Sequence, residues 1–354
     1  MNTAAGGRHI ITHSRSQCAK TCLRKHELRY VVGLQKEVPA EALRIGSAFH
    51  LAKELTRKGI DHIEAIGQAL TPYEVIPPWS TEYDWRIERE TIYRLLVGYL
   101  SYWPANYLEA VETEMPFEIP IIDPVTGIIA QQFVSGGKID GIVRLPDGRL
   151  AIDETKTTSS ALDDESDFWA RLRIDDQISR YFHAARQLGF DIACVHYDVI
   201  RKPTIEPRGV PIIEDGAKVV LDRNGVRQRT KDAKKWRETG DAAQGWTLQT
   251  RPETPDEYGD RISDDIAVNP SKYFARREVT RTESDIAEFL VDQWQVKRLI
   301  SSGMNMRNTG ACLLPYRCEY FEACSNGWKA GDVLPNGFKL VDFVHPELQQ
   351  ETVK

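Results

Sequence analysis

The sequence predicts an α/β protein in which helices flank a central mixed β-sheet, and three features of its pattern indicate this. Apolar residues recur at helical spacing in four segments, residues 41–58, 84–103, 164–188 and 282–300. Residues 109–145 instead alternate like strands and are divided by the turn signals DPVTG and PDG. A further strand-like run occupies residues 193–202. Helices that alternate with strands in one chain favour helical layers packed on a sheet.

The elements follow in order along the chain. In the first helical segment Ile45, Phe49 and Ala52 fall on one face, which predicts that this helix buries that face. We expect three or four strands within residues 109–145, and the last pair reads GGKIDGIVRL, a turn at PDG, then RLAIDETKT. The long helix after this pair ends at Gly189, and Thr282 with Asp285 resembles a capping box at the start of the final helix.

The chain length of 354 residues allows about two domains at roughly 150 residues each. Residues 203–270 are rich in Pro, Gly and charge and interrupt the core pattern. We therefore predict a core formed by residues 1–202 and 271–330, an insertion lobe over residues 203–270, and a C-terminal tail over residues 331–354. No apolar run approaches the ~18 residues of a membrane span, so we expect no membrane partner and a cytoplasmic location.

Charge is unevenly distributed, although the net charge is −6. The net charge of residues 1–36 is +6 and that of residues 201–235 is +5, so the rest of the chain carries −17. Because phosphate binding depends on local charge, such segments can hold a polyanion. For residues 201–235 an ordinary solvated surface explains the charge equally well.

Two carboxylates and a lysine are expected to meet on one face of the sheet. Glu154 and Lys156 project from the same side of their strand, and the PDG turn brings Asp140 of the preceding strand near Glu154. Buried charge of this kind needs a compensating cation, and Mg²⁺ binds one or two protein carboxylates together with phosphate oxygens and water. The same three residues could instead form an exposed salt-bridge cluster. Which interpretation holds, metal site or salt bridges, depends on the residues around them.

Four further residues are candidate neighbours. Gln177 and Tyr181 lie four residues apart and share one helix face, where they could bind a phosphate or simply be half-buried polar residues. His50 is either a core histidine or a neutral imidazole ligand. Glu114, at the start of a strand, either faces solvent or reaches a metal, and Glu112 is its rival.

The order His50, Glu114, Asp140, Glu154-x-Lys156 and Gln177-x-x-x-Tyr181 resembles the RecB-like branch of the PD-(D/E)XK nucleases over about residues 14–327. The resemblance implies a restriction-endonuclease-like core. It implies that His50, Asp140 and Glu154 bind Mg²⁺ or Mn²⁺, that Lys156 is catalytic, and that Gln177 and Tyr181 support the active site and DNA binding. Glu114 would be a further acidic ligand.

Six cysteines are too few for a disulfide scaffold and are unevenly placed. Iron–sulfur members of this branch have one cysteine near the N-terminus and three near the C-terminus, and Cys22, Cys312, Cys318 and Cys324 resemble that arrangement. The five residues between Cys312 and Cys318 depart from the tighter spacing of the family. Four thiolates can hold a [4Fe–4S] cluster or Zn²⁺, and the spacing favours iron–sulfur. Cys18 could substitute as a ligand or be incidental, and Cys194 suits an apolar strand.

These observations predict a metal-dependent DNA nuclease, an exonuclease that acts on single-stranded DNA or duplex ends in recombination, repair or phage DNA processing. A recombination or phage protein is a further expected partner. The alternative is a non-catalytic DNA-binding or scaffolding subunit that retains the fold and the cluster. Trp236 and Tyr273 are candidates for stacking on bases.

Overall fold

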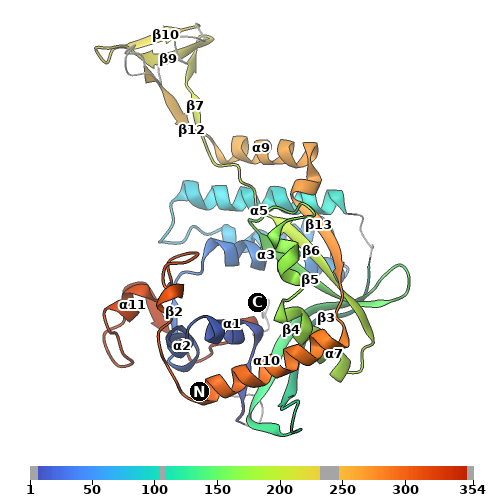
Figure 1. Cartoon of the computed structure of the whole chain (residues 1–354). Coiled ribbons are helices and arrows are strands. Elements are labelled where there is room, and N and C mark those ends of the chain that lie inside the picture. Colours follow the sequence, from blue (N-terminus) through green and yellow to red (C-terminus); the bar gives the residue numbers. More distant parts are fainter. Residues whose placement is uncertain (1–6, 104–107, 232–246, 349–354) are drawn as a thin grey trace.

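The computed structural model describes residues 7–103, 108–231 and 247–348. Its centre is a six-stranded mixed sheet with the order β1-β4-β5-β6-β13, in which β3 also pairs with β4. Helices cover both faces of this sheet (Figure 1). The predicted α/β class with a central mixed sheet is therefore confirmed.

The helices are α1 (His13–Thr21), α2 (Leu23–His26), α3 (Glu41–Arg57), α4 (His62–Leu70), α5 (Glu82–Tyr102), α6 (Asp167–Leu172), α7 (Asp176–Gln187), α9 (Pro255–Val268), α10 (Glu283–Ser301) and α11 (Phe321–Ser325), with a π-helical turn η1 (Glu27–Val31) after α2. The strands of the central sheet are β1 (His9–Ile11), β3 (Glu109–Ile122), β4 (Ile129–Arg144), β5 (Leu150–Thr158), β6 (Ile192–Arg201) and β13 (Phe274–Val279). The remaining strands are β2 (Leu34–Lys36), β7 (Gly209–Pro211), β8 (Ile213–Glu214), β9 (Ala217–Leu221), β10 (Arg227–Thr230), β11 (Thr247–Leu248), β12 (Thr250–Pro252) and β14 (Phe338–Leu340).

The expected elements appear with two differences. Residues 109–145 form two long strands, β3 and β4, where three or four strands were expected. The helix expected over residues 164–188 is divided into α6 and α7. The capping box that begins α10 is present, because the Thr282 and Asp285 side chains each accept a hydrogen bond from the backbone N–H of the other residue.

Strand β4 has three partners, and their arrangement creates an opening in the sheet. β3 runs antiparallel to β4 along nearly its whole length and so occupies one edge. On its other side β4 pairs with β1 through residues 133–135 of β4 and with β5 through residues 142–144 of β4. β5 continues as a parallel partner of β6 over residues 150–158. β4 and β5 therefore diverge after a short paired region, and Asp140 lies where they separate.

Two apolar clusters hold helices on the faces of the sheet. One cluster joins α3, α4, α5 and α9 with the buried residues Ile200 and Phe274 of the sheet. The other packs α7 against β4, β5 and β6, with Ile178 and Phe182 as fully buried contacts. At ~25 cal/mol per Å² of buried apolar surface, such clusters are the main stabilising contribution to the layered core. No helix in the described part of the chain is long and apolar enough to cross a membrane.

The insertion contains an arm that projects from the body (Figure 1). The two-stranded ribbon β7–β12 connects the body to a small sheet formed by β8, β9, β10 and β11. Part of its positive charge is neutralised locally, since Arg227 pairs with Glu214 and Arg229 with Asp215. The helix α9 that follows packs on α5 through Ile262 and other apolar residues, so it lies against the body.

The two aromatic residues considered for base stacking have different outcomes. Trp236 lies outside the described residues. Tyr273 is fully buried, and its hydroxyl group hydrogen bonds to Asp265. The prediction that Tyr273 stacks on bases is wrong, because its ring fills the core beneath α9 and has no free face.

The segment expected as a polar tail contains structure. β14 pairs with β2 in an antiparallel ribbon, and Phe338 joins Leu34 and Tyr320 in a small apolar cluster. His345 has 0% exposed surface. Residues close to the two chain ends are therefore packed together.

Candidate active site

The divergence of β4 and β5 places the Asp140 side chain between the two strands. Its Oδ2 accepts a hydrogen bond of 3.0 Å from the backbone N–H of Thr155. The carboxylate thus takes the place of a strand–strand hydrogen bond that β5 loses as it leaves β4. Asp140 is 8% exposed, and a carboxylate at this depth needs polar partners or a cation.

His50 approaches Asp140 from α3. The helix buries Ile45, Phe49 and Ala52, as its spacing predicts, and this packing turns His50 toward the sheet. The Nδ1 atom of His50 lies 3.3 Å from Asp140 Oδ2. Burial lowers the pKa of His50 despite the opposing charge of Asp140. The neutral imidazole that this favours is the form that binds metals.

Glu154 lies beside Asp140 and is 2% exposed. Its Oε1 atom is 2.7 Å from Lys156 Nζ and accepts a hydrogen bond of 3.1 Å from Gln177 Nε2. Its Oε2 atom is buried and has no hydrogen-bond partner among the described residues. Burial, followed by the negative charge of Asp140, raises the pKa of Glu154 to about 8. An unpaired carboxylate oxygen of this kind is a typical ligand atom for a hard cation.

Helix α7 supplies Gln177 and Tyr181 on one face, as their spacing predicts. Gln177 Nε2 also donates to the Tyr181 hydroxyl group at 2.9 Å, and that hydroxyl donates to the carbonyl of Lys138 at 3.0 Å. The pair therefore connects α7 to both β4 and Glu154. The glutamine is in position to fix the orientation of the Glu154 carboxylate.

Glu114 lies next to this group, whereas Glu112 is exposed. The backbone of Glu114 has φ = 52°, a left-handed conformation that costs a non-glycine residue on the order of 1–3 kcal/mol. Its carboxylate pairs with Lys138. Burial raises the pKa of Glu114, and the charge of Asp140 adds to this effect. Of the two glutamates, Glu114 is therefore the one that lies close to Asp140.

Comparison with families of known proteins gives a match over residues 10–325, to the family described as the PD-(D/E)XK nuclease superfamily. The chain belongs to this superfamily. No curated protein matches it. Among solved structures, one titled "Crystal structure of SSO0001" is similar at 15% identity and a TM-score of 0.21, and the match covers 70% of this chain and 84% of that one. This similarity is too weak to indicate a fold or a function for the chain.

Behind the PD-(D/E)XK site lies a buried ionic network that we did not predict from the sequence. Lys53 Nζ lies 2.6 Å from Asp198 Oδ2 and 3.6 Å from Asp153 Oδ2. Arg57 pairs with the same Asp153 and donates to the backbone carbonyl of Asp140 at 3.1 Å. Residues 50, 53 and 57 lie on one face of α3, and that spacing was the signal that could have identified the network. The network fixes α3, and with it His50, against β5.

We expect Lys53→Met to lower the free energy of unfolding by about 3 kcal/mol, because removal of one member of a buried ion pair leaves uncompensated charge. Urea unfolding followed by circular dichroism measures the change. Lys58→Met is the matched control, one residue beyond the end of α3. Its side chain is 53% exposed and, among the residues that the structure describes, forms an ion pair with Glu54 alone, so the loss should be within about 0.5 kcal/mol. Equal losses in the two variants would contradict a stabilising role for the network.

The four cysteines singled out in the sequence line one cavity of about 180 Å³ in this PD-(D/E)XK chain. Cys22 comes from the end of α1, and the other three, Cys312, Cys318 and Cys324, come from the segment around α11. The two segments also contact each other directly, since Asn308 donates from Nδ2 to the Thr21 carbonyl at 2.9 Å and from its backbone to Cys22 Sγ at 3.4 Å.

Cys18 and Cys194 lie outside this cavity. Cys18 is 8% exposed and packs with Tyr30 and Val344, and burial raises its pKa to about 11. Cys194 is buried in a separate apolar cluster with Ala151. Both positions suit small apolar side chains better than ligand thiolates, which need to lose a proton.

Proposed function

We propose that this PD-(D/E)XK protein is a divalent-metal-dependent deoxyribonuclease that acts on single-stranded DNA or duplex ends as an exonuclease. The observation that carries the proposal is the buried Oε2 atom of Glu154, which has no hydrogen-bond partner in the part of the chain that the structure describes. Glu154 lies beside Asp140, and its other carboxylate oxygen contacts Lys156. Roles in recombination, repair or phage DNA processing, with a protein from such a process as partner, would suit this activity.

The donor set fits Mg²⁺ or Mn²⁺. His50, Asp140 and Glu154 offer one imidazole and two carboxylates, and Glu114 offers a further carboxylate if it releases Lys138. Oxygen-rich sites of this type suit hard divalent cations, and an imidazole is compatible with Mn²⁺. The atoms of His50, Asp140 and Glu154 are not all within 4.8 Å of one another in the described residues, so binding requires the side chains to draw together. A bound ion would supply positive charge at the phosphate and a more acidic water.

The protein's own residues prepare the site for phosphodiester hydrolysis. Lys156 presents an ammonium group beside Glu154, where it can stabilise charge that develops on a phosphate oxygen. Gln177 holds Glu154 by its amide, and Tyr181 fixes Gln177 relative to β4. Lys53 and Arg57 hold His50 over Asp140 from the rear of the site.

We also propose that Cys22, Cys312, Cys318 and Cys324 bind a [4Fe–4S] cluster. All four cysteines line the same cavity. Their sequence spacings are not the two-to-four-residue pairs that favour Zn²⁺, so an iron–sulfur cluster suits this set better than a single Zn²⁺ ion. Its role would be to join the two terminal segments.

The test is a nuclease assay on end-labelled single-stranded and duplex DNA with Mg²⁺, Mn²⁺ or EDTA, comparing the wild type with Asp140→Ala. We expect cleavage that requires the metal, releases short products from the ends, and is lost in the variant because a ligand and the hydrogen bond to Thr155 are removed. DNA binding without cleavage by the wild type under all metal conditions would instead support the alternative of a scaffolding subunit. Retention of full activity by Asp140→Ala would contradict the site assignment.

A further inference from the structure

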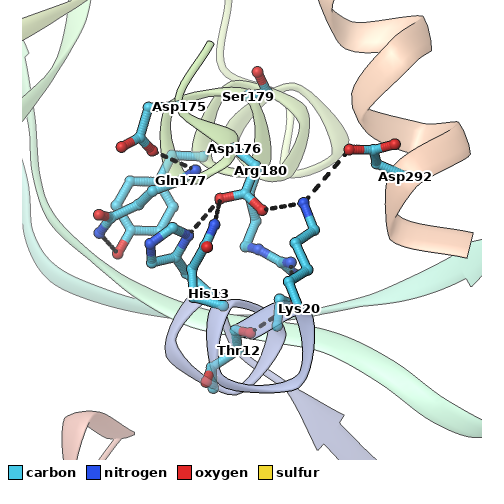
Figure 2. Close-up of polar contacts among 12 residues, drawn as sticks. Thr12, His13, Lys20, Asp175, Asp176, Gln177, Ser179, Arg180 and Asp292 are labelled. Carbon is cyan, nitrogen blue, oxygen red and sulfur yellow. Dashed lines mark hydrogen bonds and ion pairs between the residues drawn. The ribbon is translucent and has the colours of Figure 1, made fainter. Parts of the chain in front are cut away.

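His13 is the first residue of α1, and its ring faces Asp176 in the first turn of α7 (Figure 2). Its Nδ1 atom lies 2.8 Å from Asp176 Oδ1, and its side chain is 23% exposed. No described residue forms a hydrogen bond with the other ring nitrogen, Nε2. The imidazole is thus held through one nitrogen and free to interact through the other.

Asp176 is held firmly by α1. Gln17 Nε2 donates to its Oδ1 at 2.7 Å, and Lys20 Nζ lies 3.0 Å from its Oδ2. Residues 13, 17 and 20 lie on one face of α1, so three side chains of one helix contact a single carboxylate. Figure 2 shows His13 and Lys20 on either side of Asp176. Burial acts to raise the pKa of Asp176, but the contacts with His13 and Lys20 hold it well below its usual value. An ionised Asp176 fixes the orientation of the imidazole.

This arrangement adjoins the proposed catalytic residues. Asp176 directly precedes Gln177, which donates to Glu154. Asp175 has a carboxylate oxygen within 4.8 Å of the ligand atoms of His13 and Asp176, and its charge acts on the ammonium group of Lys156. The same carboxylate caps α7 through the backbone N–H of Gln177 at 2.7 Å. His13 and Lys156 therefore both lie close to Asp175 at the start of α7.

We propose that His13 is a further substrate-contacting residue, which donates from Nε2 to a backbone phosphate next to the scissile one, with Asp176 as its positioning residue. The inference rests on the proposed nuclease function. Both ring nitrogens of an imidazolium are donors, so Asp176 on one side and a phosphate on the other match a charged ring. A metal ion at His13, Asp175 and Asp176 is less suitable, because Lys20 and Gln17 already occupy the oxygens of Asp176.

The experiment compares His13→Ala and His13→Gln with Gln17→Ala. Gln17 contacts the same carboxylate but lies one helical turn further along α1, so its removal reports the docking of α1 on α7 alone. Binding of a labelled single-stranded oligonucleotide is measured by fluorescence anisotropy at several salt concentrations in the absence of divalent metal. KM and kcat for cleavage of the same oligonucleotide are measured with Mn²⁺, and thermal melting checks the fold of each variant.

Both His13 variants should bind DNA about tenfold more weakly at low salt, as expected for loss of a charged hydrogen bond. The slope of log K against log salt should fall by about 0.7, the value for one phosphate contact on a single strand. KM should rise more than kcat falls, and Gln17→Ala should keep the wild-type slope. If this slope is unchanged in the His13 variants, or if it falls equally in Gln17→Ala, His13 does not contact a phosphate.

Two further outcomes separate this inference from its rivals. If raised Mn²⁺ concentrations restore cleavage by His13→Ala, the residue is a metal ligand and the phosphate contact is overturned. If the wild type fails to cleave DNA, the proposed nuclease function fails. The salt dependence of binding, which needs no cleavage, still decides whether His13 contacts a phosphate.

Discussion

Lys156→Met should reduce kcat for DNA cleavage by about 10²–10³-fold, the loss found when one donor to developing transition-state charge is removed. The ammonium group lies 2.7 Å from Glu154 and is the described cation nearest to its carboxylate. Methionine keeps the length of the side chain but cannot stabilise charge on a phosphate oxygen. Single-turnover cleavage of an end-labelled oligonucleotide with Mn²⁺ measures the change, and anisotropy shows whether DNA binding is retained.

Lys202→Met is a suitable control for this prediction. Lys202 follows the end of β6, the neighbour of β5, so the variant removes one positive charge near the same sheet without touching Glu154. We expect cleavage close to that of the wild type. A loss of cleavage in Lys156→Met that parallels an equal loss of DNA binding would show that the lysine only attracts DNA, and would contradict a role in the chemical step.

Cys22→Ala should abolish binding of the proposed cluster and destabilise the protein strongly. Cys22 is the one N-terminal cysteine in the cavity, and the other three cavity cysteines follow α10. Since metal binding contributes directly to folding free energy in such sites, the variant should lose iron, lose the visible absorbance of an iron–sulfur centre, and melt at a much lower temperature. Iron and sulfide analysis of anaerobically purified protein, with differential scanning calorimetry, measures these changes.

Cys18→Ala provides the matched control, because Cys18 lies one turn earlier on the same helix but packs with Tyr30 and Val344 outside the cavity. It should retain iron and absorbance and lose only a small amount of stability. Stoichiometric zinc in the wild type, or iron content unaffected by Cys22→Ala, would contradict the iron–sulfur assignment.

The sheet and the carboxylate–lysine group could be predicted because their signals are local. The PDG turn pairs two strands that are close in sequence, and the twofold alternation of side chains then places Glu154 and Lys156 together. The superfamily match and the mixed α/β fold agree with this interpretation. The roles of His50, Glu114, Gln177 and Tyr181 stay predictions, although the structure brings these residues close to Asp140 and Glu154.

The features that the sequence did not reveal depend on distant residues. The break between α6 and α7 contains no proline or glycine. It is stabilised by Arg281, which donates to the carbonyls of Leu172 and Asp175, both at 2.8 Å. Lys53, on α3, could not be assigned to a buried network because its partner Asp198 lies on β6, far along the sequence. In each case a charged side chain that would be expected at the surface is buried by a partner more than one hundred residues away.

The described part of the arm, residues 209–231 and 247–252, leaves the body at β7 and returns at β12, and these two strands pair with each other. Because its two ends are neighbours, the intervening sequence can lengthen or shorten without changing the separation of β4 and β5, which carry Asp140 and Glu154. Mutations can therefore change the length of this arm without moving the candidate active site. The same geometry makes the ribbon a natural point of attachment for a foreign domain or a fluorescent label.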